Sequence, residues 1–189
     1  MNKSHLRQLA LARRKNVSEA VFGLLNEALQ QEFMDFITSF RLPHRMMSFQ
    51  PIVERREVHM SFIHETLESL GHQLCFPRVE NEHDMVAYLM KSGDPMITSA
   101  WGIQEPVGGT VVKPTDFDII LLPLLAFDLK GNRVGYGKGF YDRYLVNCRP
   151  DCLKIGISLF DPVDLIEEVE SHDIPLDIAI CPAKLYDFR

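Results

Sequence analysis

The longest apolar run of the chain covers residues 118–127, with the sequence DIILLPLLAF. A run this short and this nearly unbroken predicts a β-strand that is buried on both faces, as in a sheet covered by helices on both sides. The next residues, 128–132, predict a tight turn, because Gly131 and Asn132 tolerate the positive φ that a reversal needs. The other predicted elements are arranged around this strand and turn.

Helical periodicity predicts three helices before the strand and one after it. The first covers residues 2–15, and the second begins after Ser18, which is a suitable N-cap, and continues into residues 33–40. The second helix has an apolar stripe at Val21, Leu24, Leu25, Ala28 and Leu29. The third covers residues 58–70 and ends at Gly71, and the fourth covers residues 140–146.

Further strands are predicted at residues 45–49, 74–79, 85–90, 153–160 and 178–180, the last of these being the final strand. The strand–helix–strand order in the first half predicts parallel pairing, and Pro77 indicates a strand end or an edge strand. Residues 164–169 predict a short acidic helix or turn. These patterns together predict one α/β domain over residues 1–189, with three layers and a mixed, largely parallel sheet.

The amino-acid composition and net charge exclude some classes of protein. Hydrophobic residues make up 46% of the chain and charged residues 24%, which favours a packed core over disorder. The formal net charge of −6 argues against a dedicated nucleic-acid-binding protein, although a local basic pocket is compatible with it. The N-terminal residues show no secretory signal, and no apolar run is long enough to span a membrane. We therefore expect a cytoplasmic protein, and a monomer.

The four cysteines offer no metal site. They are Cys75, Cys148, Cys152 and Cys181, with no CxxC pair and no histidine at zinc-ligand spacing. This pattern predicts reduced thiols that are mostly buried.

Three glycines alternate with other residues over positions 135–139, directly before the fourth helix. Glycines let the backbone approach a ligand closely and turn its N–H groups inward. Arg133 and Lys138 add positive charges suited to phosphate, and Asp142 adds a hard carboxylate suited to Mg²⁺. The spacing fits neither a Walker A loop nor the dinucleotide fingerprint, so a glycine-rich turn is the alternative interpretation.

The same segment carries a long motif, P-x-x-A-F-D-x-x-G-x-R-x-G-x-G-x-G-x-Y-D-R, over residues 123–143. It resembles the signature of the 5-formyltetrahydrofolate cyclo-ligase family, the methenyltetrahydrofolate synthetases. The resemblance implies a fold related to the sugar-phosphate isomerase and CoA-transferase-like group. It also implies the Mg²⁺- and ATP-dependent conversion of 5-formyltetrahydrofolate to 5,10-methenyltetrahydrofolate, with release of ADP and phosphate, through a phosphorylated formyl intermediate.

The resemblance implies roles for individual residues. Lys138 and Arg133 would stabilise the charge on the moving phosphoryl group. The ATP-binding residues would be Lys3, Arg7, Arg133, Gly135, Gly137, Lys138, Gly139 and Tyr141. The folate-binding residues would be Glu57, Trp101, Tyr136 and Phe140, and the magnesium ligands would be Asp142 and Asp173.

Some of these residues also have simpler interpretations. Lys3 and Arg7 lie one helical turn apart and share a face, whereas Arg13, Arg14 and Lys15 are expected on a solvated face. Glu57 suits a helix N-terminus, and since His59 replaces the usual aspartate of the family motif, Glu54 competes with it for the folate role. Trp101 is either core or a stacking surface for the pterin, and Asp173 is either a ligand or a turn residue.

Two other functions stay open on the sequence alone. One is a nucleotide- or folate-binding protein without catalytic activity, and the other is a sugar-phosphate isomerase of the related fold. An isomerase would need no ATP, and it would leave the Lys3–Arg7 pair and Trp101 without a purpose.

Overall fold

The computed structural model describes all residues from Met1 to Arg189 and places eight strands in one mixed sheet, in the order β12-β11-β10-β7-β1-β2-β3-β6. These strands are β1 (Arg45–Met47), β2 (Gln73–Val79), β3 (Met85–Leu89), β6 (Thr110–Val112), β7 (Ile119–Pro123), β10 (Leu153–Ile157), β11 (Ile178–Cys181) and β12 (Lys184–Asp187). The central strands pair in parallel from β11 to β2. Antiparallel pairs lie at both edges, so the prediction of a mixed, largely parallel sheet is confirmed.

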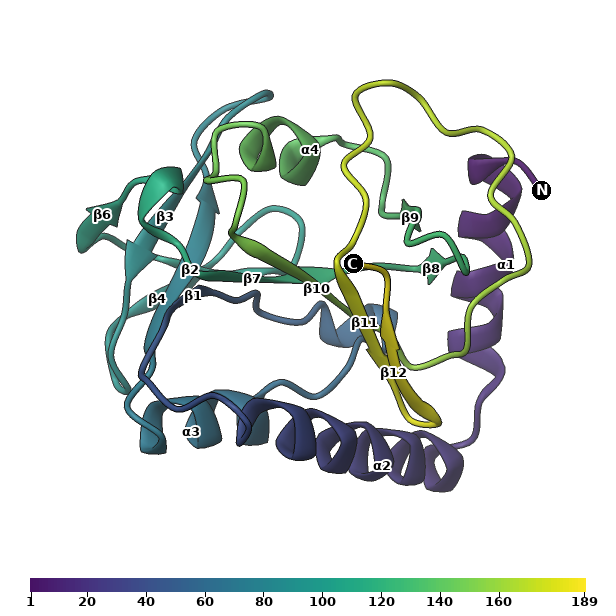
Figure 1. Cartoon of the computed structure of the whole chain (residues 1–189), viewed down its shortest axis with the longest axis horizontal. Coiled ribbons are helices and arrows are strands. Elements are labelled where there is room, and N and C mark those ends of the chain that lie inside the picture. The colour runs from purple at the N-terminus through teal and green to yellow at the C-terminus, as the bar shows by residue number, and fades with distance from the viewer.

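Four helices flank the sheet (Figure 1). They are α1 (Lys3–Asn16), α2 (Glu19–Ile37), α3 (Ser61–Ser69) and α4 (Phe140–Leu145). Helices α2 and α3 lie below the sheet in Figure 1, α4 lies above it, and α1 stands at one end, beside the small β8–β9 pair (Ala126–Phe127 and Arg133–Val134). None of the helices combines the length and the apolar character needed to cross a bilayer.

Strand β7 shows why the sheet is covered on both faces. Ile119 and Leu121 belong to the hydrophobic cluster that contains α2 and α3, whereas Ile120 and Leu122 belong to the cluster that contains α4. Alternate side chains of a strand point to opposite faces, so all of these residues are buried, at 0–1% exposure. The prediction of a strand buried on both faces is confirmed.

Two crossover connections leave the sheet in opposite directions. The connection from β1 to β2 contains α3, which packs on one face, and the connection from β7 to β10 contains α4, which packs on the other. Because β1 and β7 are neighbours, the strand order reverses between them. A crevice outside the carboxyl ends of strands at such a point is the usual ligand site of an α/β sheet.

The structure corrects several sequence predictions. Residues 178–180 are not the final strand, because β12 follows and pairs antiparallel to β11. Residues 164–169 form neither the predicted helix nor a hydrogen-bonded turn; instead Val163 donates to the Phe127 carbonyl of β8, and Ile166 donates to the Asp128 carboxylate. Pro77 lies in an inner strand, but β1 pairs only with residues 73–75 of β2, so the proline faces no partner on that side.

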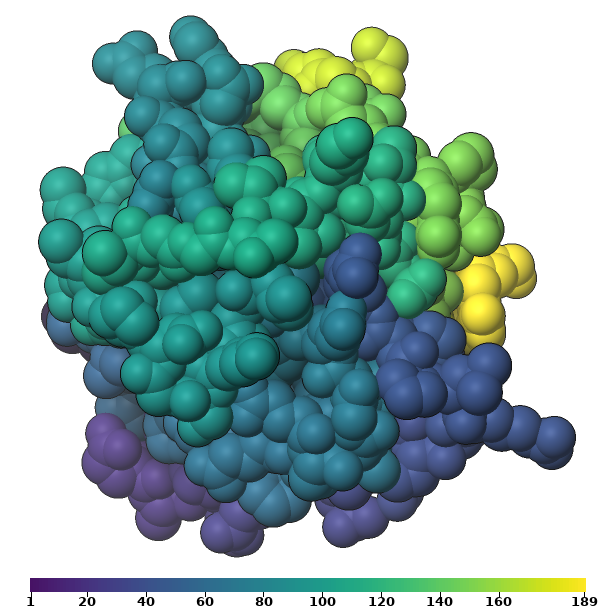
Figure 2. All heavy atoms as spheres, turned by 90° about the vertical axis from the view of Figure 1, so that its left-hand side faces the viewer, coloured from purple at the N-terminus to yellow at the C-terminus, as the bar shows by residue number.

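Two further differences concern the buried face of α2 and the surroundings of Trp101. Leu29 of the expected stripe is buried, but Val21 and Leu24 are exposed, and α2 also buries Phe22, Asn26, Phe33 and Ile37. The only tryptophan lies between two short strands that were not predicted, β4 (Met96–Thr98) and β5 (Gln104–Pro106). On the face shown in Figure 2, the loop between β2 and β3 (residues 80–84) projects at the top of the molecule.

Candidate active site

A cavity of about 440 Å³ lies at the carboxyl ends of β1, β2 and β7, where the strand order reverses. Phe49 follows β1, Val79 ends β2 and Pro123 ends β7, and all three line it. The cavity is also lined by every residue that the sequence suggested for the site: Lys3, Arg7, Glu57, Trp101, Arg133, Gly135, Tyr136, Gly137, Lys138, Gly139, Phe140, Tyr141, Asp142 and Asp173. The fold therefore brings together positions that are up to 170 residues apart in sequence.

The glycine-rich segment forms one wall and is held in place by α1. Gly137 has a φ of +88°, and a Cβ added there would lie 3.1 Å from the Arg7 guanidinium carbon. Arg7 Nε donates to the Gly135 carbonyl at 2.8 Å. Gly139 has a φ of +70°, and a Cβ there would lie 2.7 Å from the Arg143 guanidinium. The positive φ favours glycine at both positions, and a larger residue would in addition displace the Arg7 or Arg143 guanidinium.

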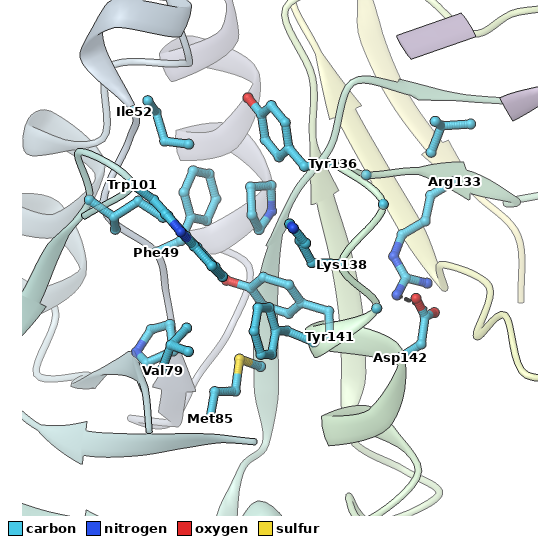
Figure 3. A pocket seen from close by; sticks show the side chains of 18 of the residues that line it. Phe49, Ile52, Val79, Met85, Trp101, Arg133, Tyr136, Lys138, Tyr141 and Asp142 are labelled. Atoms are coloured by element: carbon cyan, nitrogen blue, oxygen red, sulfur yellow. Dashed lines mark hydrogen bonds and ion pairs between the residues drawn. The ribbon is translucent and has the colours of Figure 1, made fainter. Parts of the chain in front are cut away.

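One end of the cavity holds paired charges. Arg133 Nη2 lies 2.7 Å from an Asp142 carboxylate oxygen, and its Nη1 donates to the Ile174 carbonyl (Figure 3). Lys3 Nζ lies 2.5 Å from the Asp173 carboxylate. Burial raises the pKa of Asp173, but hydrogen bonds from Lys3 and from the backbone of Glu170 outweigh it, so the pKa lies below its ordinary value. This end joins α1, the glycine segment, α4 and the loop before β11.

The other end is aromatic and apolar. Trp101 lies opposite Tyr141, with Phe49, Val79 and Met85 on the same side of the cavity (Figure 3). The ring centroids of Trp101 and Phe140 are 5.6 Å apart, and Lys138 Nζ lies 5.7 Å from the Trp101 ring. Trp101 is 44% exposed, which excludes a core role and leaves its face available to a flat ligand.

Glu57 also lines the cavity. It is 4% exposed; one carboxylate oxygen accepts from the Ile52 N–H at 2.7 Å, and the other accepts from the Tyr136 hydroxyl. Burial, followed by the negative charge of Glu57, raises the pKa of Tyr136, so the phenol stays protonated and acts as a donor. Glu54 is exposed and does not line the cavity, so the geometry favours Glu57 as the ligand-facing carboxylate.

Comparison with known proteins identifies the family. The sequence profile of the 5-formyltetrahydrofolate cyclo-ligase family matches residues 1–182. The chain belongs to the 5-formyltetrahydrofolate cyclo-ligase family. The 5-formyltetrahydrofolate cyclo-ligase of Mycoplasma genitalium is 27% identical over 185 residues, which are 96% of this chain and 98% of the relative. That of Mycolicibacterium smegmatis is 27% identical over 191 residues, which are 97% of this chain and 95% of the relative.

Solved structures of the family have the same fold. The 5,10-methenyltetrahydrofolate synthetase of Aquifex aeolicus superposes with a TM-score of 0.79 at 30% sequence identity, covering 100% of this chain and 94% of its own. The 5,10-methenyltetrahydrofolate synthetase of Mycoplasma pneumoniae also gives a TM-score of 0.79, at 25% identity, covering 96% of this chain and 99% of its own. The α/β fold is that of the cyclo-ligase family, and the protein is an enzyme of that family.

The carboxylates of this cyclo-ligase fit a hard divalent cation. Asp142 and Asp173 both line the charged end of the cavity, and carboxylate oxygens are the ligands that Mg²⁺ prefers. In the structure each is neutralised by a cation, Asp142 by Arg133 and Asp173 by Lys3. Glu170 and His172 also bring ligand atoms within 4.8 Å of Asp173, but both are exposed.

The sequence did not indicate the buried apolar lining of the cavity, which includes Phe49, Ile52, Met85 and Val134, nor the buried Arg14 behind it. Arg14 was expected on a solvated face, but it is 4% exposed and its guanidinium contacts Tyr136 and Leu124. A signal was present in the sequence: Lys3, Arg7 and Arg14 are spaced by four and seven residues, so they share one face of the helix. Arg13 and Lys15 are exposed, as expected.

Proposed function

We propose that this protein converts 5-formyltetrahydrofolate and ATP to 5,10-methenyltetrahydrofolate, ADP and phosphate. The observation that supports this is the lining of the cavity of about 440 Å³. Its aromatic end suits a flat pteridine, its charged end suits a polyphosphate, and the glycine segment runs between the two. The formyl group of a bound folate would therefore lie close to the γ-phosphoryl group of a bound nucleotide.

The chemistry explains why both ligands must share one cavity. The formyl oxygen is part of an amide and is a poor leaving group. The γ-phosphoryl group moves to that oxygen and ADP departs. The second folate nitrogen then forms a bond to the formyl carbon and loses its proton to solvent, and the carbon–oxygen bond breaks with release of phosphate. Such a transfer needs positioning and charge neutralisation more than a strong acid or base.

Separate groups of residues would position the substrates and neutralise the charge. Glu57, Tyr136, Trp101 and Phe140 would orient the pterin. Lys138, Arg133 and the backbone N–H groups of residues 135–139 would stabilise the charge on the phosphoryl group as it moves. Lys3, Arg7 and Tyr141 would hold the remainder of the nucleotide.

Asp142 and Asp173 would hold Mg²⁺. The cation supplies charge neutralisation for the phosphate oxygens of the nucleotide. Arg133 and Lys3, which neutralise these carboxylates in the structure, line the same cavity and would then be available to phosphate oxygens.

Turnover should require both ATP and a divalent cation. We expect methenyl absorbance to appear from 5-formyltetrahydrofolate with Mg-ATP, and to disappear when EDTA is added or the nucleotide is omitted. Methenyl formation that persists in EDTA without nucleotide would contradict the proposal. Binding of both ligands without turnover would instead identify a non-catalytic binding protein. A sugar-phosphate isomerase would act on sugar phosphates without ATP.

Replacing Trp101 by alanine should raise the KM for 5-formyltetrahydrofolate more than it lowers kcat, because stacking on the pterin contributes equally to the ground state and the transition state. The melting temperature should change little, since Trp101 is 44% exposed. In the wild-type protein, added folate should quench the fluorescence of this single tryptophan. Normal folate binding by a variant that melts much earlier would assign Trp101 to the core.

We also propose that a monomer carries out the reaction in the cytoplasm. All the residues suggested for the site come from one chain and line one cavity, so no second subunit is needed to complete it. Sedimentation of the active enzyme tests the oligomeric state, and localisation of the tagged protein tests the compartment.

A further inference from the structure

The buried guanidinium of Arg14 lies behind the folate end of the cavity. Its Nη1 donates to the Tyr136 hydroxyl at 3.0 Å and its Nη2 donates to the Leu124 carbonyl at 2.7 Å. Its Nε is buried without a hydrogen-bond partner. Arg14 does not line the cavity, so it meets a ligand only through the residues in front of it.

The residue that Arg14 supports is Glu57. Arg14 Nη1 lies 3.7 Å from a Glu57 oxygen, and both side chains are 4% exposed. A carboxylate this deeply buried is costly to keep ionised unless a cation and hydrogen bonds compensate for the lost water. Arg14 supplies the cation, and the Ile52 N–H and the Tyr136 hydroxyl supply the hydrogen bonds.

Tyr136 connects this cluster to the glycine segment. Its hydroxyl donates to Glu57 and accepts from Arg14, and the Arg55 guanidinium lies 4.7 Å from its ring centroid. The backbone directly before Tyr136 is held separately, by the bond from Arg7 to the Gly135 carbonyl. Helix α1 therefore holds the glycine segment at two points, the backbone through Arg7 and the tyrosine hydroxyl through Arg14.

We propose that Arg14 is a positioning residue for the folate: it holds the Glu57 carboxylate and the Tyr136 hydroxyl in fixed orientations, so that Glu57 presents its free acceptor sites to N–H donors of the pterin. The proposal rests on the proposed function. A carboxylate has about four acceptor sites, and Ile52 and Tyr136 use two of them. Without Arg14, Glu57 has no cation to neutralise it, and its orientation depends on these two bonds alone.

The test is a comparison of Michaelis constants. Arg14→Gln should raise the KM for 5-formyltetrahydrofolate about 10- to 100-fold, which is the range expected for losing hydrogen bonds to a charged group. The KM for ATP should change less than about 3-fold, because Arg7 still holds the loop backbone. Arg14→Lys, which restores the charge, should recover part of the folate affinity. The matched control is Lys15→Gln, an exposed neighbour on the same helix, which should leave both constants unchanged.

The outcomes separate this inference from the proposed function. If the wild-type protein does not turn over, the proposed function fails, and folate quenching of Trp101 fluorescence still compares Arg14→Gln with wild type. If the wild-type protein turns over and Arg14→Gln has an unchanged folate KM, or equal increases in both constants, the positioning role is wrong. If Arg14→Gln does not fold, Arg14→Lys serves in its place. It keeps the charge but cannot donate to Tyr136 and Leu124 together as the guanidinium does, so it should show a smaller but still selective rise in the folate KM; an unchanged KM there also overturns the proposal.

Discussion

Replacing Lys138 by alanine should lower kcat about 100-fold, or ~3 kcal/mol, by analogy with the removal of one preorganised donor from an active site. Lys138 is exposed and has no carboxylate partner, unlike Lys3 and Arg133, which both form ion pairs. Its ammonium group lies over the Trp101 ring, at the boundary between the two ends of the cavity. A cation in this place can follow the phosphoryl group, so its effect should be concentrated in the transition state.

The measurement is kcat at saturating Mg-ATP and 5-formyltetrahydrofolate. Lys130→Ala is the matched control, since Lys130 is also exposed but belongs to the turn before β9 and does not line the cavity. The control should turn over at the wild-type rate. If Lys138→Ala is also near the wild-type rate while Arg133→Ala is inactive, the charge role belongs to Arg133.

Replacing Arg133 by alanine should abolish measurable turnover and destabilise the protein by about 2–3 kcal/mol. The Arg133 side chain is 7% exposed, and its removal leaves the Asp142 carboxylate without a cation and the Ile174 carbonyl without this donor. Breaking a fully buried ion pair costs more, but Asp142 retains 24% exposure. Equilibrium urea unfolding measures the loss, and methenyl absorbance measures the turnover.

A double variant distinguishes the two roles of Arg133. Arg133→Met combined with Asp142→Asn removes both charges, so it should recover much of the stability without recovering activity. Arg189→Ala, which breaks an exposed ion pair with Asp187, should change neither property. If Arg133→Ala and Lys138→Ala are both near normal, the interpretation of residues 135–139 as a phosphate cradle is wrong.

The sequence predicted what depends on local pattern. The double-sided burial of β7, the turn at Gly131 and the start of α2 after Ser18 follow from apolar runs, glycine and capping, and all three are present. Strand β12 was missed because it is short. It has only four residues, Lys184–Asp187, with a charged residue at each end, and it pairs with a neighbour along one edge only. Nothing local distinguishes such a segment from a loop.

Arg14 shows which kind of site residue cannot be predicted from local sequence. Its neighbours Arg13 and Lys15 are exposed as a basic run suggests, but Arg14 is buried because a hydroxyl and a carbonyl more than 100 residues away lie beside it. The polar and glycine residues of the cavity lining were found through the family resemblance, which indicates the side chains that reach a ligand, whereas apolar lining residues such as Phe49 and Met85 were not found. A side chain such as that of Arg14, which contacts cavity-lining residues but not the ligand, is indicated in the sequence only by its spacing along the helix.

The ion pair between Lys3 and Asp173 closes a loop of 170 residues, and this sets the order in which the site can form during synthesis. Protein chains emerge N-terminus first at about 5–20 residues per second, so roughly 10–30 s separate the appearance of the two partners. For most of that interval α1 lacks Ile166, which is buried beside Leu6 and Val134. A nascent chain can thus build the strands from β1 to β7 while the charged end of the cavity is unfinished, and that end is complete only once Asp173 has emerged.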